Sequence, residues 1–388
     1  MTLGCRSFSL AVTLVSVAAS GQGRLQPAGA LAEARAQHTA TLLADGRVLV
    51  AGGRGADATA TLASTELFDP KTNAWRAGPP MTTARAGHTA TLLDDGRVLV
   101  VGGTAPARDG SARLEALDSA EVFDPAKRTW QRVGALAEAR NGHTATKLAD
   151  GSVLVVGGAR PVHQHLSSVE RFDPVTASFS RAASLGLGRW LHDAVRLADG
   201  SVVVLGGRSN QLRSEGGVAT PKPGLPLDAV ERFDVDAGTW APLPALTEPR
   251  QRTAVVALGA KVVVFGGQTS TMSTNYVEWW QAPAGEWAQS ATHLSVPIAG
   301  HTASVLPSGD VLVVGGEPPQ AVDTARVQRW VPSTQRWCLA GTLKVSRKAH
   351  AATVLKDGSV LVSGGTSAGL AEASAERWVP VKGECVEP

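Results

Sequence analysis

Pairs of adjacent glycines recur along the chain at a nearly constant spacing. There are seven pairs, and their first glycines lie 50, 55, 49, 60, 49 and 49 residues apart. A fixed period of about fifty residues indicates a repeat architecture in which each copy is one small structural unit. The period suits four short strands with their turns, so seven copies predict seven such units. The pairs are Gly52-Gly53, Gly102-Gly103, Gly157-Gly158, Gly206-Gly207, Gly266-Gly267, Gly315-Gly316 and Gly364-Gly365.

Each copy carries the same succession of strand and turn signals. In the second copy, residues 89–92 alternate between polar or small and apolar side chains, which is typical of a strand. Asp95-Gly96 then tolerates the positive φ angles of a tight hairpin. The apolar run 98–101, which ends at the glycine pair, predicts a strand covered on both faces. A third strand is expected at 121–123, and Trp130 marks a fourth.

Large aromatic side chains mark the third and fourth strands in a constant register. In six copies the two aromatics are seven residues apart. A constant register predicts a fixed hairpin, and aromatics at these positions can wedge between neighbouring sheets and bury much apolar surface. We interpret them as packing between units and not as a binding surface. The pairs are Phe68/Trp75, Phe123/Trp130, Phe172/Phe179, Phe233/Trp240, Trp280/Trp287 and Trp330/Trp337.

These signals predict an all-β fold, a seven-bladed β-propeller over residues 21–388 with four antiparallel strands in each blade. The ring must close, because a free sheet edge invites aggregation. Leu25 precedes Gly52 by 27 residues, the separation that Trp75 has from Gly102, so residues 24–29 are expected to complete blade seven as a displaced fourth strand. Cys385 competes for the same slot, and we expect the C-terminal tail to lie over that blade.

The first twenty residues have the pattern of a signal peptide. Arg6 is followed by an apolar run from Phe8 to Val17 and then by small residues. At about ten residues, the run is too short to cross a bilayer as a helix. We therefore expect export, giving a secreted, periplasmic or cell-envelope protein, with a buried N-terminal element as the alternative. A lipoprotein is disfavoured because the apolar run follows Cys5.

Removing residues 1–20 leaves two cysteines, Cys338 and Cys385. An even number is compatible with one disulfide in an oxidising compartment, and a bridge between these two is one hypothesis. Two separate thiols are the alternative, because disulfide geometry is strict and the two residues belong to neighbouring blades.

A glycine pair followed by a variable loop, an aromatic and a tryptophan seven residues later resembles the kelch motif. The variants with His-Thr-Ala-Thr and Asp-Gly-x-Val-Leu-Val-x-Gly-Gly are similar to bacterial kelch-repeat proteins related to the propeller of galactose oxidase. The resemblance covers residues 25–388 and implies the propeller fold. It does not extend to the copper radical chemistry of galactose oxidase, which needs two tyrosines, because this chain has only Tyr276.

One face of the disc is expected to hold a ring of arginines and histidines. Because the first two strands of a blade are antiparallel, the loop after each glycine pair shares a face with the residues before the first strand. In the fifth copy we interpret Arg252 as standing at the histidine position with Arg250 nearby, and the sixth copy has Ile298 before His301. The other copies pair Arg35 with His38, Arg85 with His88, Arg140 with His143, Arg189 with His192 and Arg347 with His350.

Two interpretations of this ring remain open. Kelch domains that recognise acidic peptides contact them through arginines at similar positions, so the resemblance implies an anion-attracting pocket for a carboxylate, a sugar acid or an acidic peptide. Alternatively, a side chain repeated in nearly every blade is a structural hydrogen-bonder that ties loops to the neighbouring blade. A metal is not expected, because sevenfold spacing around a channel does not bring several ligands to one ion.

Insertions in blades two and four break the symmetry on the same face. The longer one, from Arg208 to Ala229, contains Asn210 and Arg213. Long loops on rigid scaffolds often carry recognition, which makes these two residues candidate ligand contacts. A passive insertion is the alternative, because closing a longer loop costs little.

The formal charge is only +3 and the basic residues are scattered, which predicts no nucleic-acid partner. No nucleophile, acid–base pair, phosphate loop or metal cluster stands out from the repeat. We therefore predict an exported, monomeric, non-catalytic binding module without a cofactor, with a protein or glycan ligand of acidic character. One alternative is an epimerase- or lyase-type enzyme acting on an acidic sugar at the channel mouth, similar to kelch-type sialic acid mutarotases. Another is a structural envelope protein.

Overall fold

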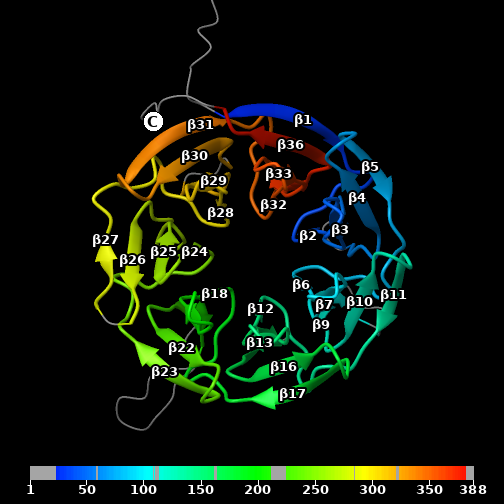
Figure 1. The fold of residues 1–388 in the computed structure, drawn as a ribbon, viewed down its shortest axis with the longest axis horizontal. Coiled ribbons are helices and arrows are strands. Elements are labelled where there is room, and N and C mark those ends of the chain that lie inside the picture. The colour runs from blue at the N-terminus through cyan, green and yellow to red at the C-terminus, as the bar shows by residue number, and fades with distance from the viewer. Residues whose placement is uncertain are drawn as a thin grey trace, which may run out of the picture.

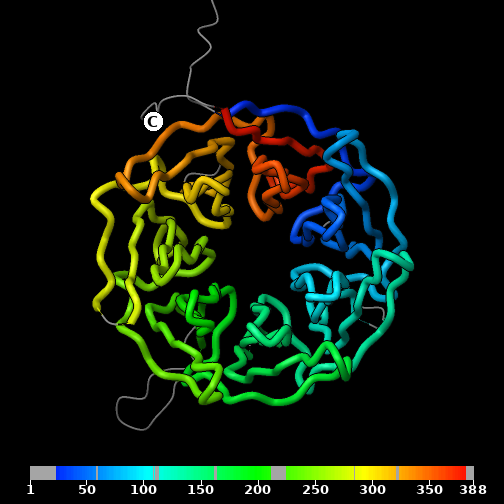
Figure 2. Tube along the Cα trace, viewed as in Figure 1, coloured from blue at the N-terminus to red at the C-terminus, as the bar shows by residue number. Residues whose placement is uncertain are grey.

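Seven four-stranded sheets stand radially around a central channel (Figure 1), and the chain visits them in sequence order around the ring (Figure 2). The computed structural model describes residues 23–57, 60–107, 109, 113–160, 164–210, 224–283, 285–319 and 323–381. The predicted all-β, seven-bladed propeller is confirmed. Over the described residues, no helix has the length and apolar character needed to cross a membrane.

The four strands of a blade are antiparallel, and the first one lies closest to the channel. Blade one consists of β2 (Thr39–Leu42), β3 (Val48–Ala51), β4 (Thr65–Asp69) and β5 (Ala74–Ala77). Blade two consists of β6 (Thr89–Leu92), β7 (Val98–Val101), β10 (Ala120–Asp124) and β11 (Thr129–Arg132). Blade three consists of β12 (Thr144–Lys147), β13 (Val153–Val156), β16 (Val169–Asp173) and β17 (Ser178–Ala182). Blade four consists of β18 (Asp193–Arg196), β19 (Val202–Leu205), β22 (Val230–Asp234) and β23 (Thr239–Leu243).

The remaining blades follow the same plan. Blade five consists of β24 (Ala254–Leu258), β25 (Lys261–Phe265), β26 (Val277–Gln281) and β27 (Ala288–Gln289). Blade six consists of β28 (Thr302–Val305), β29 (Val311–Val314), β30 (Arg326–Val331) and β31 (Arg336–Thr342). Blade seven consists of β32 (Ala351–Val354), β33 (Val360–Ser363), β36 (Ser374–Val379) and β1 (Arg24–Ala30). Four short hairpins follow glycine pairs: β8 (Thr104–Pro106) with β9 (Leu114–Ala116), β14 (Ala159–Arg160) with β15 (Gln164–His165), β20 (Arg208–Ser209) with β21 (Leu225–Pro226), and β34 (Thr366–Ser367) with β35 (Leu370–Ala371).

The hydrophobic core is divided into seven clusters, one at each seam between neighbouring blades. At the seam of blades one and two, Phe123 of β10 packs with Leu49 and Leu67 of blade one. All four residues of β3 are buried, as expected for a second strand covered on both faces. The interpretation of the third-strand aromatics as packing between blades is confirmed, since each cluster contains one of them.

The N-terminal strand closes the ring. β1 pairs antiparallel with β36, and Leu25 stands opposite Trp378 in the register that sets Trp75 opposite Phe68 in blade one. Blade seven is therefore assembled from the two ends of the described chain, at the place where the sequence predicts a displaced strand over 24–29.

The two faces of the disc carry different segments. The segment after each glycine pair bridges to the residues just before the first strand of its own blade, as Arg54 does to Ala36. We call this side the loop face. The hairpin turns between β2 and β3 and between β4 and β5, with their counterparts in the other blades, lie on the opposite side, which we call the turn face.

Candidate functional site at the channel mouth

The arginines of the predicted ring are buried inside their own blades. The Arg85 guanidinium donates to the carbonyl oxygens of Gly102 and Ser119 at 2.8 and 3.0 Å, and to Glu121 Oε1 at 2.8 Å. The side chains of Arg85 and Glu121 are both 0% exposed. A charge without access to water is tolerated when it is paired and hydrogen-bonded in this way.

The same arginine–glutamate pair recurs in six blades. The glutamate also holds the linker that enters the blade, as where Glu121 Oε2 accepts the Thr82 N–H at 2.7 Å. Blade six has neither charge: Ile298 replaces the arginine and Gln328 the glutamate, yet Gln328 still accepts the Ser295 N–H at 3.0 Å. The pairs are Arg35–Glu66, Arg85–Glu121, Arg140–Glu170, Arg189–Glu231, Arg250–Glu278 and Arg347–Glu376.

Burial decides between the two interpretations of the arginines. All six side chains are 0% exposed, so none of them can meet a ligand. The expected anion pocket is not formed by these residues, because their own glutamates and carbonyl oxygens satisfy the guanidiniums. Their role is to lock each blade to the linker from the preceding one.

The histidines join neighbouring blades. His88 Nε2 lies 3.0 Å from Thr39 Oγ1 of blade one. A Cβ added to Gly52 would lie 2.9 Å from His88 Cε1 and 2.4 Å from the Arg85 carbonyl oxygen, so a side chain there would clash. The glycine pair of one blade and the Arg-x-x-His of the next therefore form one interlock. Equivalent bonds join His143 to Thr89, His192 to Thr144 and His350 to Thr302. His38 bonds instead to Ser363 of β33, the cross-strand partner of Ala351, which stands at the Thr39 position in blade seven.

Burial keeps these imidazoles neutral. Desolvation, together with the charges of nearby arginines, lowers the pKa of His38, His192 and His350 to about 3. The pKa of His88 and His143 is also lowered well below the ordinary value, mainly by burial. These side chains are only 5–7% exposed, which fits the structural interpretation better than ligand contact.

Blade five departs from the pattern, and the structure corrects our interpretation of it. The position that we gave to Arg252 belongs to Thr253, whose Oγ1 donates to Asp193 of blade four. The first hairpin of this blade is one residue short, because Thr253 precedes Gly266 by 13 residues where His38 precedes Gly52 by 14. Arg252 stands one position earlier, with a positive φ of 52°.

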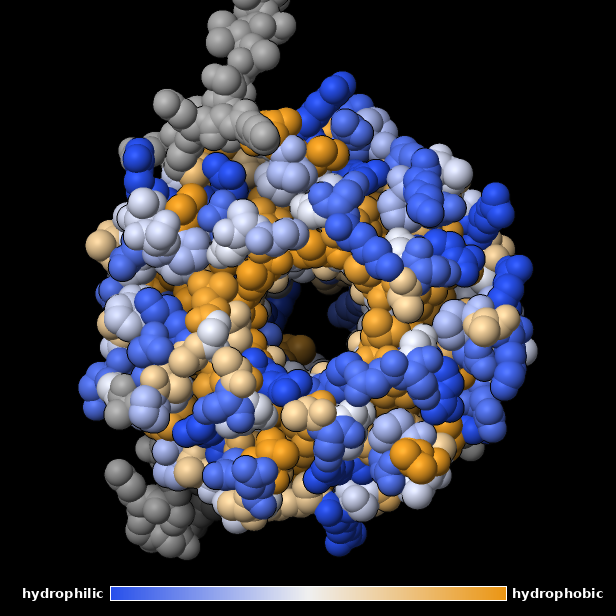
Figure 3. Space-filling model, viewed as in Figure 1, coloured by the Kyte–Doolittle hydropathy of each residue, from blue (hydrophilic) through white to orange (hydrophobic). Residues whose placement is uncertain are grey.

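Seven backbone hydrogen bonds form a closed ring around the channel on the loop face. In each blade, the residue before the histidine position donates its N–H to the carbonyl of its counterpart in the preceding blade, at 2.9–3.4 Å. All seven have positive φ angles, from 51 to 65°. Figure 3 shows the open channel at the centre of the disc. We call these residues the mouth ring: Gln37, Gly87, Gly142, Leu191, Arg252, Gly300 and Ala349.

Charged side chains gather on one side of the mouth ring. Glu317 lies between two cations, with Oε2 at 3.2 Å from Arg252 Nη1 and Oε1 at 2.6 Å from Lys348 Nζ. A Cβ added to Gly300 would stand 2.7 Å from Arg252 Nη2, so the absence of a side chain there makes room for the guanidinium. Burial alone would raise the pKa of Glu317, but Lys348 and Arg252 outweigh it and lower the pKa, so the carboxyl is ionised at neutral pH.

A cavity of about 280 Å³ opens beside this cluster and is lined by Arg54, Arg252 and Lys348, which we call the mouth cations. Arg54 Nε donates to Gln37 Oε1 at 3.0 Å. The three cations come from blades one, five and seven, and besides Glu317 the Asp323 carboxylate lies 3.6 Å from Lys348 Nζ. The Arg252 and Lys348 side chains are 28% and 24% exposed, so they can contact a ligand while their stems stay packed.

Sequence reasoning named Arg252, in another role, and missed Arg54 and Lys348, because it followed the residues that every copy repeats. Arg252 and Lys348 stand at the two variable positions between the arginine and the histidine, and Arg54 directly follows a glycine pair. The usable signal was a charged residue at positions that hold Gly, Ala or another uncharged residue in most copies. Among the described residues, no three His, Cys, Asp or Glu side chains could hold one metal ion.

Several other predicted residues lie at the edge of what the structure describes. The Asn210 N–H donates to His165 Nδ1 at 3.1 Å and so ties the loop of blade four to that of blade three. Cys338 is fully buried and disulfide-bonded. Arg213, Cys385 and the leader at 1–20 lie outside the described residues, so the Cys338–Cys385 pairing stays a prediction.

Comparison with known families accounts for the repeat. The family model of the KLHDC2/KLHL20/DRC7 kelch-repeats domain matches residues 11–207, which is half of the chain. The chain belongs to the kelch-repeat family. The kelch resemblance carried by the glycine pairs and the aromatics is confirmed.

Two curated proteins match shorter stretches of this kelch propeller. Kelch repeat and BTB domain-containing protein 12 of Danio rerio is 31% identical over 122 residues, covering 28% of this chain and 19% of that protein. Kelch-like protein 4 of Homo sapiens is 37% identical over 62 residues, covering 16% of this chain and 9% of that protein. The chain thus matches less than a fifth of the length of either relative.

A solved structure extends the likeness to nearly the whole kelch propeller. The fungal alcohol oxidase of the AA5 family, solved in complex with copper, superposes with a TM-score of 0.68 over 93% of this chain and 76% of that chain. The two sequences are 17% identical, so the likeness is one of fold alone.

Proposed function

We propose that this kelch propeller is an exported, non-catalytic binding module that holds an acidic protein or glycan ligand at the mouth of its channel on the loop face. The observation that carries the proposal is the convergence of Arg54, Arg252 and Lys348 on one cavity. Recognition of one asymmetric ligand needs a site that departs from the sevenfold repeat, and these cations depart from it. Guanidinium and ammonium groups that line one cavity favour a carboxylate-bearing ligand.

Exposed apolar side chains on the same face support a large ligand. Leu225, Met272 and Leu370 are 51%, 57% and 68% exposed, and each lies in a segment that follows a glycine pair. Apolar side chains around a charged centre are a usual composition for a surface that binds a protein. The proposed ligand therefore places its acidic group in the cavity and its body on the surrounding loops.

An ionised Glu317 supports binding over catalysis. A general base works best when its pKa lies near the operating pH, whereas the two neighbouring cations lower the pKa of Glu317. The epimerase or lyase alternative keeps one supporting feature, because Glu317 is an asymmetric acid beside the mouth cations. A Glu317→Gln variant that binds ligand normally but abolishes a measured turnover would favour the enzyme.

Export is part of the proposal and rests on the composition of residues 1–20. A mature protein recovered from the periplasm or the medium, with its N-terminus after the small residues that follow Val17, is the expected result. A full-length chain retained in the cytoplasm would remove this part of the proposal and leave the binding site untouched.

Arrays of acidic peptides and acidic oligosaccharides test the site. The wild type is expected to bind a subset of acidic probes, and Arg252→Ala and Lys348→Ala are expected to weaken binding by about tenfold each, the loss typical of one charge-assisted contact. Arg208→Ala is the matched control, because Arg208 follows a glycine pair as Arg54 does but donates to the Gly224 carbonyl. Equal binding by all these proteins would exclude the mouth as the site.

A further inference from the structure

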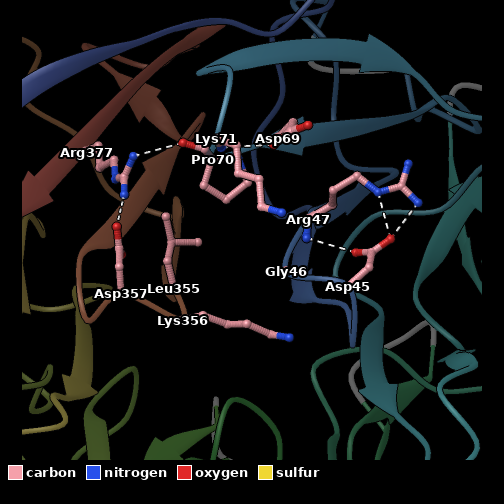
Figure 4. Close-up of a pocket in the computed structure, with 10 residues that line it drawn as sticks. All are labelled: Asp45, Gly46, Arg47, Asp69, Pro70, Lys71, Leu355, Lys356, Asp357 and Arg377. Carbon is pink, nitrogen blue, oxygen red and sulfur yellow. Dashed lines mark hydrogen bonds and ion pairs between the residues drawn. The ribbon is translucent and has the colours of Figure 1, made fainter.

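A second cavity lies on the turn face, away from the mouth ring. It has a volume of about 420 Å³ and sits at the seam between blades one and seven (Figure 4). Blade one contributes the turn at Arg47 and the turn that carries Lys71, and blade seven contributes Lys356 and Arg377. This seam is where the ring closes, since β1 completes blade seven.

The two arginines of this cavity have acidic partners. Arg47 Nη2 lies 2.6 Å from Asp45 Oδ2. Arg377 pairs with Asp357, and its Nη1 donates across the seam to the Pro70 carbonyl oxygen at 3.2 Å. These contacts hold the walls of the cavity in place.

The two lysines of the cavity differ from its two arginines in their partners. Within the described part of the chain, no carboxylate forms an ion pair with Lys71 or Lys356. Lys356 reaches across the seam, where its Nζ donates to the Ala44 carbonyl oxygen. Figure 4 shows both side chains extending into the space between the turns. Two ammonium groups from the first and last blades thus face one cavity, whose lining also includes Asp45 and Asp69.

This pairing of lysines is specific to the closing seam. The residues that correspond to Lys356 in blades one and two are Ala44 and Asp94, and Lys71 corresponds to Ala126 in blade two. The equivalent seam between blades one and two therefore presents Ala44 and Ala126 where the closing seam presents two lysines. The repeat does not require these cations, and the packing of the fold does not explain them.

We propose that this closure cavity binds a doubly charged phosphate-type oxyanion, as inorganic phosphate or as a phosphomonoester, between Lys71 and Lys356. Two ammonium groups are the point charges that such an anion requires, and the volume has room for a small substituent on the phosphate. Because the anion would contact both blade one and blade seven, it links the two ends of the chain. Binding therefore stabilises the closed ring by mass action. This proposal is independent of the mouth site.

Thermal unfolding and titration calorimetry of the full mature chain test it, with inorganic phosphate, glycerol 3-phosphate and sodium chloride at matched ionic strength. We expect both phosphates to raise the unfolding midpoint by about 1–2 °C and chloride to leave it unchanged. Lys71→Ala combined with Lys356→Ala is expected to abolish the shift and to weaken the affinity at least about fivefold. The shift is expected to persist in Lys127→Ala, which removes a lysine from the corresponding turn of blade two.

The outcomes distinguish free phosphate from a phosphomonoester as the ligand, and they also test whether the cavity binds either one. A shift with glycerol 3-phosphate that exceeds the shift with inorganic phosphate assigns the cavity to a phosphomonoester, and the reverse order assigns it to the free ion. A shift of equal size in the double variant, a loss of equal size in Lys127→Ala, or no shift in the wild type would overturn the proposal.

Discussion

Ile298 and Gln328 stand in blade six at the two places that an arginine and a glutamate occupy in each of the other six blades. Both side chains are 1% exposed, so the position is as buried as its charged counterparts. The two charges are absent together, whereas the hydrogen bond to the incoming linker is kept by Gln328. Buried ions must be paired, and an uncharged pair of similar shape can replace them.

Removing one member of a buried arginine–glutamate pair should therefore lower the free energy of unfolding more than removing both. Glu121→Gln leaves the Arg85 charge uncompensated in a site without water, and we expect it to lower the free energy of unfolding by about 3–5 kcal/mol. Arg85→Ile combined with Glu121→Gln reproduces the blade-six arrangement and should recover most of the loss. Urea unfolding of the wild type, the single variants and the double variant measures this. A double variant no more stable than Glu121→Gln would contradict the account.

His301 lacks the hydrogen bond to the preceding blade that the other histidines of the predicted ring make. Its two ring nitrogens have no partner among the described residues, because Ala254 stands in blade five where Thr39 and its counterparts supply a hydroxyl. Ala254→Thr should restore the bond and raise the free energy of unfolding by about 1 kcal/mol. Thr302→Ala is the matched opposite change, since it takes the hydroxyl from His350 and should cost about 1–3 kcal/mol. If both variants change the free energy of unfolding in the same direction, the threonine–histidine hydrogen bond does not stabilise the protein as we propose.

The buried histidines should make the protein sensitive to mild acid. In the unfolded chain a histidine binds a proton below about pH 6.5, whereas His38, His192 and His350 in the folded protein resist protonation down to about pH 3. Stability that is fully present above pH 6.5 is therefore lost as the pH falls, by up to about 1.4 kcal/mol per pH unit for each histidine. Urea midpoints measured from pH 7.5 to 5 should fall steadily, and less steeply in His350→Gln. A flat profile between pH 6.5 and 5 would contradict this.

Asp193 should give stability the opposite pH dependence from the histidines. Burial raises its pKa to about 7, against the hydrogen bond from Thr253. The unfolded chain loses this proton near pH 4 and the folded one near pH 7, so the contribution of Asp193 to stability falls as the pH rises between these values and is constant above. Asp193→Asn cannot ionise, so we expect it to be more stable than the wild type at pH 8 and closer to it at pH 5. Equal effects at both values would exclude a buried, proton-holding carboxyl.

The number of blades and the closure of the ring were predictable because they depend on spacing. Leu25 stands opposite Trp378 as its distance from Gly52 suggested. The phase of blade five could not be read in this way, because its first hairpin is one residue short and the Arg250-Gln251-Arg252 stretch offers two arginines for one position. Only the buried Arg250–Glu278 pair in the structure distinguishes them.

The candidate site was less predictable than the fold, because the residues that recur in every copy are those that pack the blades together. Arg85 and His88 recur because every seam needs the same interlock, and recurrence alone cannot show that their side chains are covered. A partial signal was available in Glu121 and its counterparts, which precede the third-strand aromatic by two residues in every copy except the one that also lacks the arginine. The mouth cations required the structure, because Arg54, Arg252 and Lys348 come from three different blades.

Hydrogen exchange with and without an acidic ligand from the arrays tests the central claim most directly. The account predicts that the ligand slows exchange of the amides in the three segments that carry the mouth cations, 36–54, 250–253 and 347–350, and that Arg252→Ala loses this protection while Arg208→Ala keeps it. Protection confined to the turn face or the outer rim, with the mouth ring unchanged, would contradict it.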